Sequence, residues 1–110
     1  MKEYKLSSIT LDSTAKIIAE YITEGKLVII PTDTAYGIST NALDEKAVKK
    51  VYTVKNRKLE EPLNIGVANV DMATKYAEIS ESQYKVMKRI LPGAVTFILK
   101  KKDNLPSILT

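Results

Sequence analysis

Cysteine, histidine and tryptophan are all absent from this chain of 110 residues. The absence of cysteine excludes disulfides and thiolate chemistry, which is compatible with the cytosol, and we expect a cytoplasmic protein. The absence of histidine argues strongly against a zinc site and against imidazole catalysis. Long apolar runs are lacking too, because none approaches the roughly 20 residues that a membrane helix needs. Two common nucleotide fingerprints, the Walker P-loop and G-x-G-x-x-G, do not occur.

The composition that remains is that of an ordinary soluble protein, with 45% hydrophobic and 27% charged residues. A chain of this length predicts one domain, over residues 1–110. The formal net charge of +4 favours anionic partners without identifying nucleic acid among them. The function must therefore be sought in particular stretches of the chain.

The stretch Leu27–Gly37 is the one around which the rest is organised. Its apolar run of β-branched residues predicts a buried strand. Pro31 lacks a backbone donor, so ladder pairing is expected to end there. The strand would then place four polar residues at the end of a sheet, which is where ligands bind in open α/β sheets: Thr32, Asp33, Thr34 and Tyr36.

Helical and extended patterns alternate along the chain. Apolar residues at helical spacing, preceded by capping residues such as Asp12, Asp44, Asn69 and Ser80, predict helices at residues 13–24, 45–54, 69–77 and 81–91. Extended patterns predict strands at residues 4–9, 27–31, 38–41, 63–67 and 94–99. The alternation indicates an α/β fold with a twisted, mixed or parallel sheet covered by helices.

Three loops are expected to meet at the ends of the strands: residues 32–36, 55–62 and 92–96. Hydroxyls in the first loop and Lys55, Arg57 and Lys58 in the second suit a phosphate, because arginine matches its oxygens with a planar fork and lysine supplies a point charge. A polyphosphate would also bring Mg²⁺, held mainly by its own oxygens. The plainer alternative stays open, with hydroxyls that satisfy backbone groups in turns and cations that are simply solvated.

Four motifs occur in a fixed order. They are G-x-hydrophobics-P-T-D-T-x-Y-G within Gly25–Ile38, A-V-x-x-V-Y-x-V-K-x-R over Ala47–Arg57, the pair Pro62–Leu63, and P-G-x-x-T before an apolar run within Leu91–Leu99. These motifs, in this order, resemble those of the YrdC-like domain of the threonylcarbamoyl-AMP synthases. The resemblance implies a YrdC-like fold, with a twisted, open, mixed sheet and flanking helices.

The resemblance also implies an activity. The family is a group of nucleotidyltransferases that form threonylcarbamoyl-AMP from L-threonine, bicarbonate or CO₂, and ATP, with Mg²⁺ expected to accompany the ATP. Other proteins then transfer the threonylcarbamoyl group to an adenosine of certain tRNAs, so transfer proteins and tRNA are implied partners. Family members also bind double-stranded RNA, which the basic surface of this chain would suit.

The residues carried over from the family fall into three groups. Lys55 and Arg57 are implied as the catalytic cations that stabilise phosphoryl charge, and no covalent nucleophile is required. Thr34 is implied to contact L-threonine, with Lys100 nearby. The nucleotide contacts implied are Thr32, Lys55, Arg57 and Thr96.

Three positions depart from the family pattern. Lys58 stands where proline is common, Glu61 stands where asparagine or lysine is common, and Gly66 stands where long-form members have histidine. A carboxylate at position 61 would repel phosphate, which puts the local ATP contacts in doubt. Gly66 removes or replaces one threonine contact.

The family domain continues past Thr110 with R-x-P and S-A-N motifs that help to build the nucleotide pocket. We therefore expect a partial domain, truncated at its C-terminus, whose exposed sheet edge and core surface favour a partner or a homodimer. Two alternatives to a synthase stay open. One is a non-catalytic module that binds double-stranded RNA or tRNA through the basic residues 46–58, and the other is a truncated paralogue that binds threonine or nucleotide without turnover.

Overall fold

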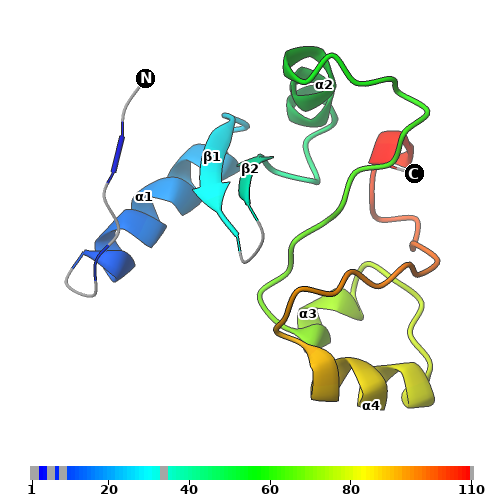
Figure 1. The fold of residues 1–110 in the computed structure, drawn as a ribbon. Coiled ribbons are helices and arrows are strands. Elements are labelled where there is room, and N and C mark those ends of the chain that lie inside the picture. The colour runs from blue at the N-terminus through cyan, green and yellow to red at the C-terminus, as the bar shows by residue number, and fades with distance from the viewer. Residues whose placement is uncertain (1–2, 5–6, 8–9, 33–34, 110) are drawn as a thin grey trace.

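The computed structural model describes residues 3–4, 7, 10–32 and 35–109. Figure 1 shows α1 beside a β-hairpin, α2 near the C-terminal turn, and α3 beside α4. In chain order the elements are α1 (Leu11–Thr23), β1 (Val28–Pro31), β2 (Tyr36–Ser39), α2 (Glu45–Val54), α3 (Val70–Ala73), α4 (Glu81–Ile90) and the 3₁₀ turn η1 (Ser107–Leu109). The α/β class expected from the sequence is confirmed, and the sheet in the described part of the chain has two strands.

The sheet is an antiparallel hairpin of β1 and β2. The register pairs Val28 with Ser39 and Pro31 with Tyr36. Pairing ends at Pro31, as expected for a residue that has no backbone donor. The predicted strand at 27–31 is therefore confirmed, but its predicted burial is wrong, because Ile29 is 58% exposed. The second strand starts at Tyr36, two residues before the predicted start at 38. The hairpin turn thus lies directly beside Tyr36.

Local capping chemistry fixes the ends of most helices. Asp44 caps α2 by accepting a hydrogen bond from the Ala47 N–H at 3.2 Å. Ser80 and Gln83 form the predicted capping box at the start of α4. Helix α1 differs from the prediction because Thr10, not Asp12, precedes its first residue, so Asp12 lies in the first turn. An acidic side chain in that turn is favourable beside the helix N-terminus.

Gly25 ends α1 in the left-handed conformation, with a φ of 77°. Its N–H donates to the Ile22 carbonyl at 2.9 Å, and the Lys26 N–H donates to the Tyr21 carbonyl at 3.0 Å. These two bonds are those of a Schellman motif. A Cβ added at Gly25 would lie 2.6 Å from Asp44 Oδ2, so this position also brings α1 against the cap of α2.

Two strand predictions are wrong for the described residues. Residues 63–67 and 94–99 form no strand, and Ile98 is 96% exposed. An extended segment becomes a strand only when its backbone pairs with a neighbour. After residues 94–99, pairing starts only at the isolated bridge between Ala77 and Lys101. The predicted helix at 69–77 is shorter too, since α3 ends at Ala73. The strand predicted at 4–9 lies mostly outside the described residues.

The core lies between α2 and the C-terminal turn. Its buried members are Val48, Tyr52, Leu105 and Leu109, with Leu63 and Ile65 among the residues packed against them. This cluster anchors the segment that follows α2. In the part of the chain that the structure describes, no helix is both long enough and apolar enough to cross a membrane.

Candidate functional site

The first group of residues predicted to contact a ligand follows the end of β1. The Thr32 N–H donates to the Ala35 carbonyl at 2.8 Å, and the Ala35 N–H donates to Thr32 Oγ1 at 3.1 Å. The Thr32 hydroxyl also donates to the Ala35 carbonyl. Thr32 therefore closes the turn, which agrees with the structural alternative considered for it. Asp33 and Thr34 lie outside the described residues, so a threonine contact by Thr34 stays a prediction.

Tyr36 stands at the end of the same turn. Its side chain is 76% exposed, so it contributes little to packing. An exposed aromatic ring beside a hydroxyl-rich turn is available for stacking on a base. The sequence alone favours packing for this tyrosine, and the observed exposure goes against that interpretation, because exposure depends on what the rest of the fold covers.

The second group lies in the loop that follows α2. Lys55 caps the helix, and Asn56 adopts a left-handed backbone with a φ of 50°. Asparagine is among the few residues other than glycine that tolerate this conformation. The next N–H, from Arg57, donates back to the Tyr52 carbonyl at 2.9 Å. The sharp reversal at Asn56 therefore places the two predicted catalytic cations on either side of one left-handed residue.

The guanidinium of Arg57 spans the loop. Its Nη2 donates to the Pro62 carbonyl at 2.8 Å, and its Nε lies 3.6 Å from Glu61 Oε2. The Nε atom is buried and has no hydrogen-bond partner. Arg57 thus carries a structural contact and an unsatisfied donor at once, and its side chain is 31% exposed.

The side chain of Tyr52 anchors this loop through its hydroxyl. Its hydroxyl donates to the Glu61 carbonyl at 2.6 Å and to the Ile108 carbonyl at 3.1 Å. The side chain is 2% exposed. A phenol buried between two carbonyl groups ties the loop to the C-terminal turn. No sequence pattern predicted this contact, because it joins residues far apart in the chain.

Lys55 and Lys58 are two cations of this loop that form no ion pair with a described residue. Both side chains are exposed, and within residues 35–109 neither amine makes an ion pair or a hydrogen bond. An amine without a partner is available to an anionic ligand. Lys55 also stands at the C-terminus of α2, where a cation is favoured by the helix dipole.

The third group lies in the extended segment before Lys101. Thr96 is exposed, and Lys100 pairs with Glu78 at 3.8 Å, with its own side chain 80% exposed. Lys100 lines a surface cavity of about 440 Å³ together with Glu78, Ile79, Ser80, Gln83, Ile98 and Leu99. Lys100 therefore lies among both polar and aliphatic side chains, while its role toward threonine stays a prediction.

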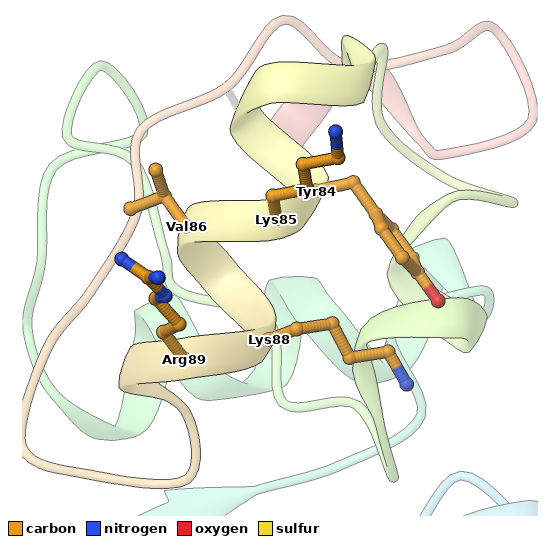
Figure 2. Close-up of a pocket in the computed structure, with 5 residues that line it drawn as sticks. All are labelled: Tyr84, Lys85, Val86, Lys88 and Arg89. Atoms are coloured by element: carbon orange, nitrogen blue, oxygen red, sulfur yellow. The ribbon is translucent and has the colours of Figure 1, made fainter.

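A second cavity, of about 510 Å³, runs along α4 and is lined by Tyr84, Lys85, Val86, Lys88 and Arg89 (Figure 2). Tyr84 and Lys88 lie on the side facing α3, where the Tyr84 hydroxyl donates to Asp71 Oδ1 at 2.5 Å and Lys88 pairs with Asp71 at 3.4 Å. These contacts, the hydrogen bond first, lower the pKa of the Asp71 carboxyl from its usual value of 3.8. Sequence analysis missed this cluster, although Tyr84 and Lys88 are spaced to share a helix face.

The predicted residues thus occupy three places: the hairpin turn, the loop after α2 and the segment before Lys101. Figure 1 shows strands β1 and β2 and the loop after α2 in different parts of the molecule. Neither cavity described above includes Thr32, Lys55 or Arg57. The convergence of the three loops on one ligand therefore stays a prediction.

Comparison with known proteins gives this arrangement a context. The family model Sua5_yciO_yrdC, which carries the description "Telomere recombination", matches residues 20–110. A Methanocaldococcus jannaschii protein, provisionally named a threonylcarbamoyl-AMP synthase, is 42% identical over 109 residues, which are 99% of this chain and 53% of the relative. The threonylcarbamoyl-AMP synthase of Pyrococcus abyssi is 42% identical over 96 residues, which are 86% of this chain and 28% of the relative.

A solved structure agrees with the sequence comparison. The crystal structure of Pyrococcus abyssi Sua5 complexed with L-threonine superposes with a TM-score of 0.85 at 37% identity. The match covers 97% of this chain and 31% of that one. The chain therefore spans about half the length of the M. jannaschii relative and less than a third of the P. abyssi proteins. Because the family model matches most of its residues, the chain belongs to the Sua5/YciO/YrdC family.

Proposed function

We propose that this chain takes part in the synthesis of threonylcarbamoyl-AMP from L-threonine, bicarbonate or CO₂, and ATP, with release of pyrophosphate. The observation that carries the proposal is the match to P. abyssi Sua5 complexed with L-threonine, at a TM-score of 0.85 and 37% identity. The names of the M. jannaschii and P. abyssi relatives support it. We propose further that residues 1–110 act as one YrdC-like unit, as part of such a domain.

The chemistry is compatible with a chain that lacks cysteine and histidine. The threonine nitrogen adds to CO₂, and a proton leaves the nitrogen. An oxygen of the resulting carbamate attacks the α-phosphorus of ATP, and the bond to the pyrophosphate oxygen breaks. No covalent bond to the enzyme forms, so positioning and charge stabilisation can supply most of the rate.

Lys55 and Arg57 are the groups we assign to phosphoryl charge. Lys55 contributes an exposed amine that no protein group occupies in the described residues, and Arg57 contributes a guanidinium whose side chain is 31% exposed. A phosphate oxygen is an acceptor that satisfies both. We assign Thr32 and Thr96 to the nucleotide, and Thr34 and Lys100 to L-threonine.

Mg²⁺ belongs to this scheme as part of the ATP substrate. Among the described residues there is no group of three or more acidic side chains that could hold a metal ion. Lys55 and Arg57 suit phosphate oxygens rather than a metal. We therefore propose that the ion arrives on ATP and is held mainly by phosphate oxygens and water.

The product is a reactive mixed anhydride, so its threonylcarbamoyl group can be transferred to a nucleophile such as a tRNA adenosine. We propose tRNA-modifying transfer proteins as the partner in this transfer and a cytoplasmic site of action. The net charge of +4 would help contact with tRNA, as a screened and salt-dependent contribution.

The test measures pyrophosphate release by the purified chain, with each substrate omitted in turn. Release that requires ATP, L-threonine and bicarbonate together supports the proposal, as does L-threonine binding by calorimetry. Pyrophosphate release that is indifferent to threonine contradicts it. L-serine in place of L-threonine serves as the matched control, because it lacks only the methyl group.

A further inference from the structure

The acidic residue in the cationic loop lies against the residue proposed to bind phosphate. Glu61 Oε2 is 3.6 Å from Arg57 Nε, a distance at which charge attracts but no hydrogen bond forms. The other described contact of the guanidinium goes from Nη2 to the Pro62 carbonyl at 2.8 Å. The carboxylate therefore approaches the one donor of Arg57 that is buried and unsatisfied.

The backbone keeps Glu61 in this place. Its N–H donates to the Lys58 carbonyl at 3.0 Å, and its carbonyl accepts the Tyr52 hydroxyl at 2.6 Å. Tyr52 is itself fixed, because it is 2% exposed and also bonds the Ile108 carbonyl. The side chain of Glu61 is 50% exposed, which allows it to turn into water.

We propose that the Glu61 carboxylate competes with ligand phosphate for Arg57 and thereby limits the affinity of the site for nucleotide. This inference rests on the proposed function, since it assumes that Arg57 meets a phosphate. A phosphate that reaches the exposed part of the guanidinium can hydrogen-bond it, whereas Glu61 at 3.6 Å from Nε makes no hydrogen bond. The exposed pair is weak, so a multiply charged phosphate can displace it.

The charged residues near Arg57 and Glu61 allow the effect of this one contact on phosphate binding to be separated from the effect of net charge. Lys55 and Lys58 are exposed amines without a described partner, and Glu60 is an exposed carboxylate without one. Glu60 and Glu61 carry the same charge and are neighbours in the chain. Only Glu61 touches Arg57, so the two residues form a matched pair for experiment.

The experiment compares Glu61→Gln with Glu60→Gln, using ATP and inorganic pyrophosphate as probes in calorimetric titrations. The Glu61→Gln chain is expected to bind each probe about two- to five-fold more tightly than the wild type, the range that an exposed ion pair allows. The Glu60→Gln chain is expected to bind about as the wild type does. Far-UV circular dichroism verifies that all three chains are folded.

A third variant links the effect to Arg57. In an Arg57→Gln background, Glu61→Gln is expected to leave pyrophosphate binding unchanged, because the competing pair no longer exists. Equal or weaker binding by Glu61→Gln than by wild type overturns the inference, since the carboxylate would then be neutral or would orient Arg57. An equal gain in the two glutamine variants overturns it as well, because general charge would explain both.

The two proposals fail in different ways. Tighter pyrophosphate binding by Glu61→Gln without any ATP- and threonine-dependent turnover supports the competition and contradicts the synthase. Turnover with no difference between Glu61→Gln and wild type supports the synthase and contradicts the competition. Failure of pyrophosphate to bind any of the chains overturns the inference outright.

Discussion

At the scale of single residues, Arg57 is the residue that we assign to phosphoryl charge and that also binds the Pro62 carbonyl. Replacing it with alanine is expected to lower turnover by about two to three powers of ten, because a preorganised donor to developing charge is lost. The measurement is the rate of ATP-, threonine- and bicarbonate-dependent pyrophosphate release. Arg89→Ala, which removes an exposed arginine from α4, is the control and is expected to keep near-normal turnover. Near-normal turnover by Arg57→Ala would remove Arg57 from the site.

Tyr52 shows how one hydroxyl supports that loop. Tyr52→Phe leaves the ring in the core but deprives the Glu61 and Ile108 carbonyls of their donor. The free energy of unfolding is expected to fall by about 1–3 kcal/mol, the usual cost of unsatisfied buried groups. Urea unfolding with an unchanged m-value measures it. Tyr36→Phe, at a ring that is 76% exposed, should change this free energy by less than about 0.5 kcal/mol; equal losses in both variants would contradict the assignment.

At the scale of elements, α3 and α4 are joined by Asp71, Tyr84 and Lys88. The Tyr84 hydrogen bond and the Lys88 charge lower the pKa of Asp71 below 3.8 in the folded chain. A carboxyl whose folded pKa is lowered stabilises the fold above its unfolded pKa, and the contribution is lost as pH falls through the folded value. Asp71→Asn is therefore expected to be less stable than wild type at neutral pH, with a difference that shrinks on acidification below 3.8.

Unfolding free energies at a series of pH values measure this convergence. The control is Asp103→Asn, which removes an exposed carboxylate that has no described ion pair or hydrogen bond. Its difference from wild type is expected to stay small and level across the same pH range. A difference for Asp71→Asn that is constant, or that grows on acidification, would show that the carboxylate does not contribute through these contacts.

The elements that sequence predicted well are those whose causes are local. The caps at Asp44 and Ser80 and the glycine at the end of α1 each act within a few residues, so a pattern reveals them. The strand predicted at 94–99 depends on a pairing partner that no local pattern supplies. The site divides in the same way. The role of Arg57 is a prediction from its motif, whereas its contacts with Glu61 and Pro62 depend on the left-handed turn at Asn56 and could not be predicted.

At the scale of the whole molecule, stability is concentrated between α2 and the C-terminal turn. Leu109 is 4% exposed within this core, whereas Ile98, in the unpaired extended segment, is 96% exposed. Leu109→Ala is expected to cost about 2–5 kcal/mol of unfolding free energy, because it removes buried methyl groups and leaves a cavity. Ile98→Ser is expected to change it by less than about 0.5 kcal/mol.

The Ile98 variant also tests the homodimer expected from the sequence. An exposed apolar segment with unpaired backbone groups is a surface on which a second chain can add a strand. Sedimentation over a range of concentrations is expected to show less self-association for Ile98→Ser than for wild type, with the monomer's stability unchanged. A loss of unfolding free energy in Ile98→Ser as large as that in Leu109→Ala would instead mean that Ile98 is buried in solution. Unaltered self-association would show that residues 94–99 are not where two copies meet.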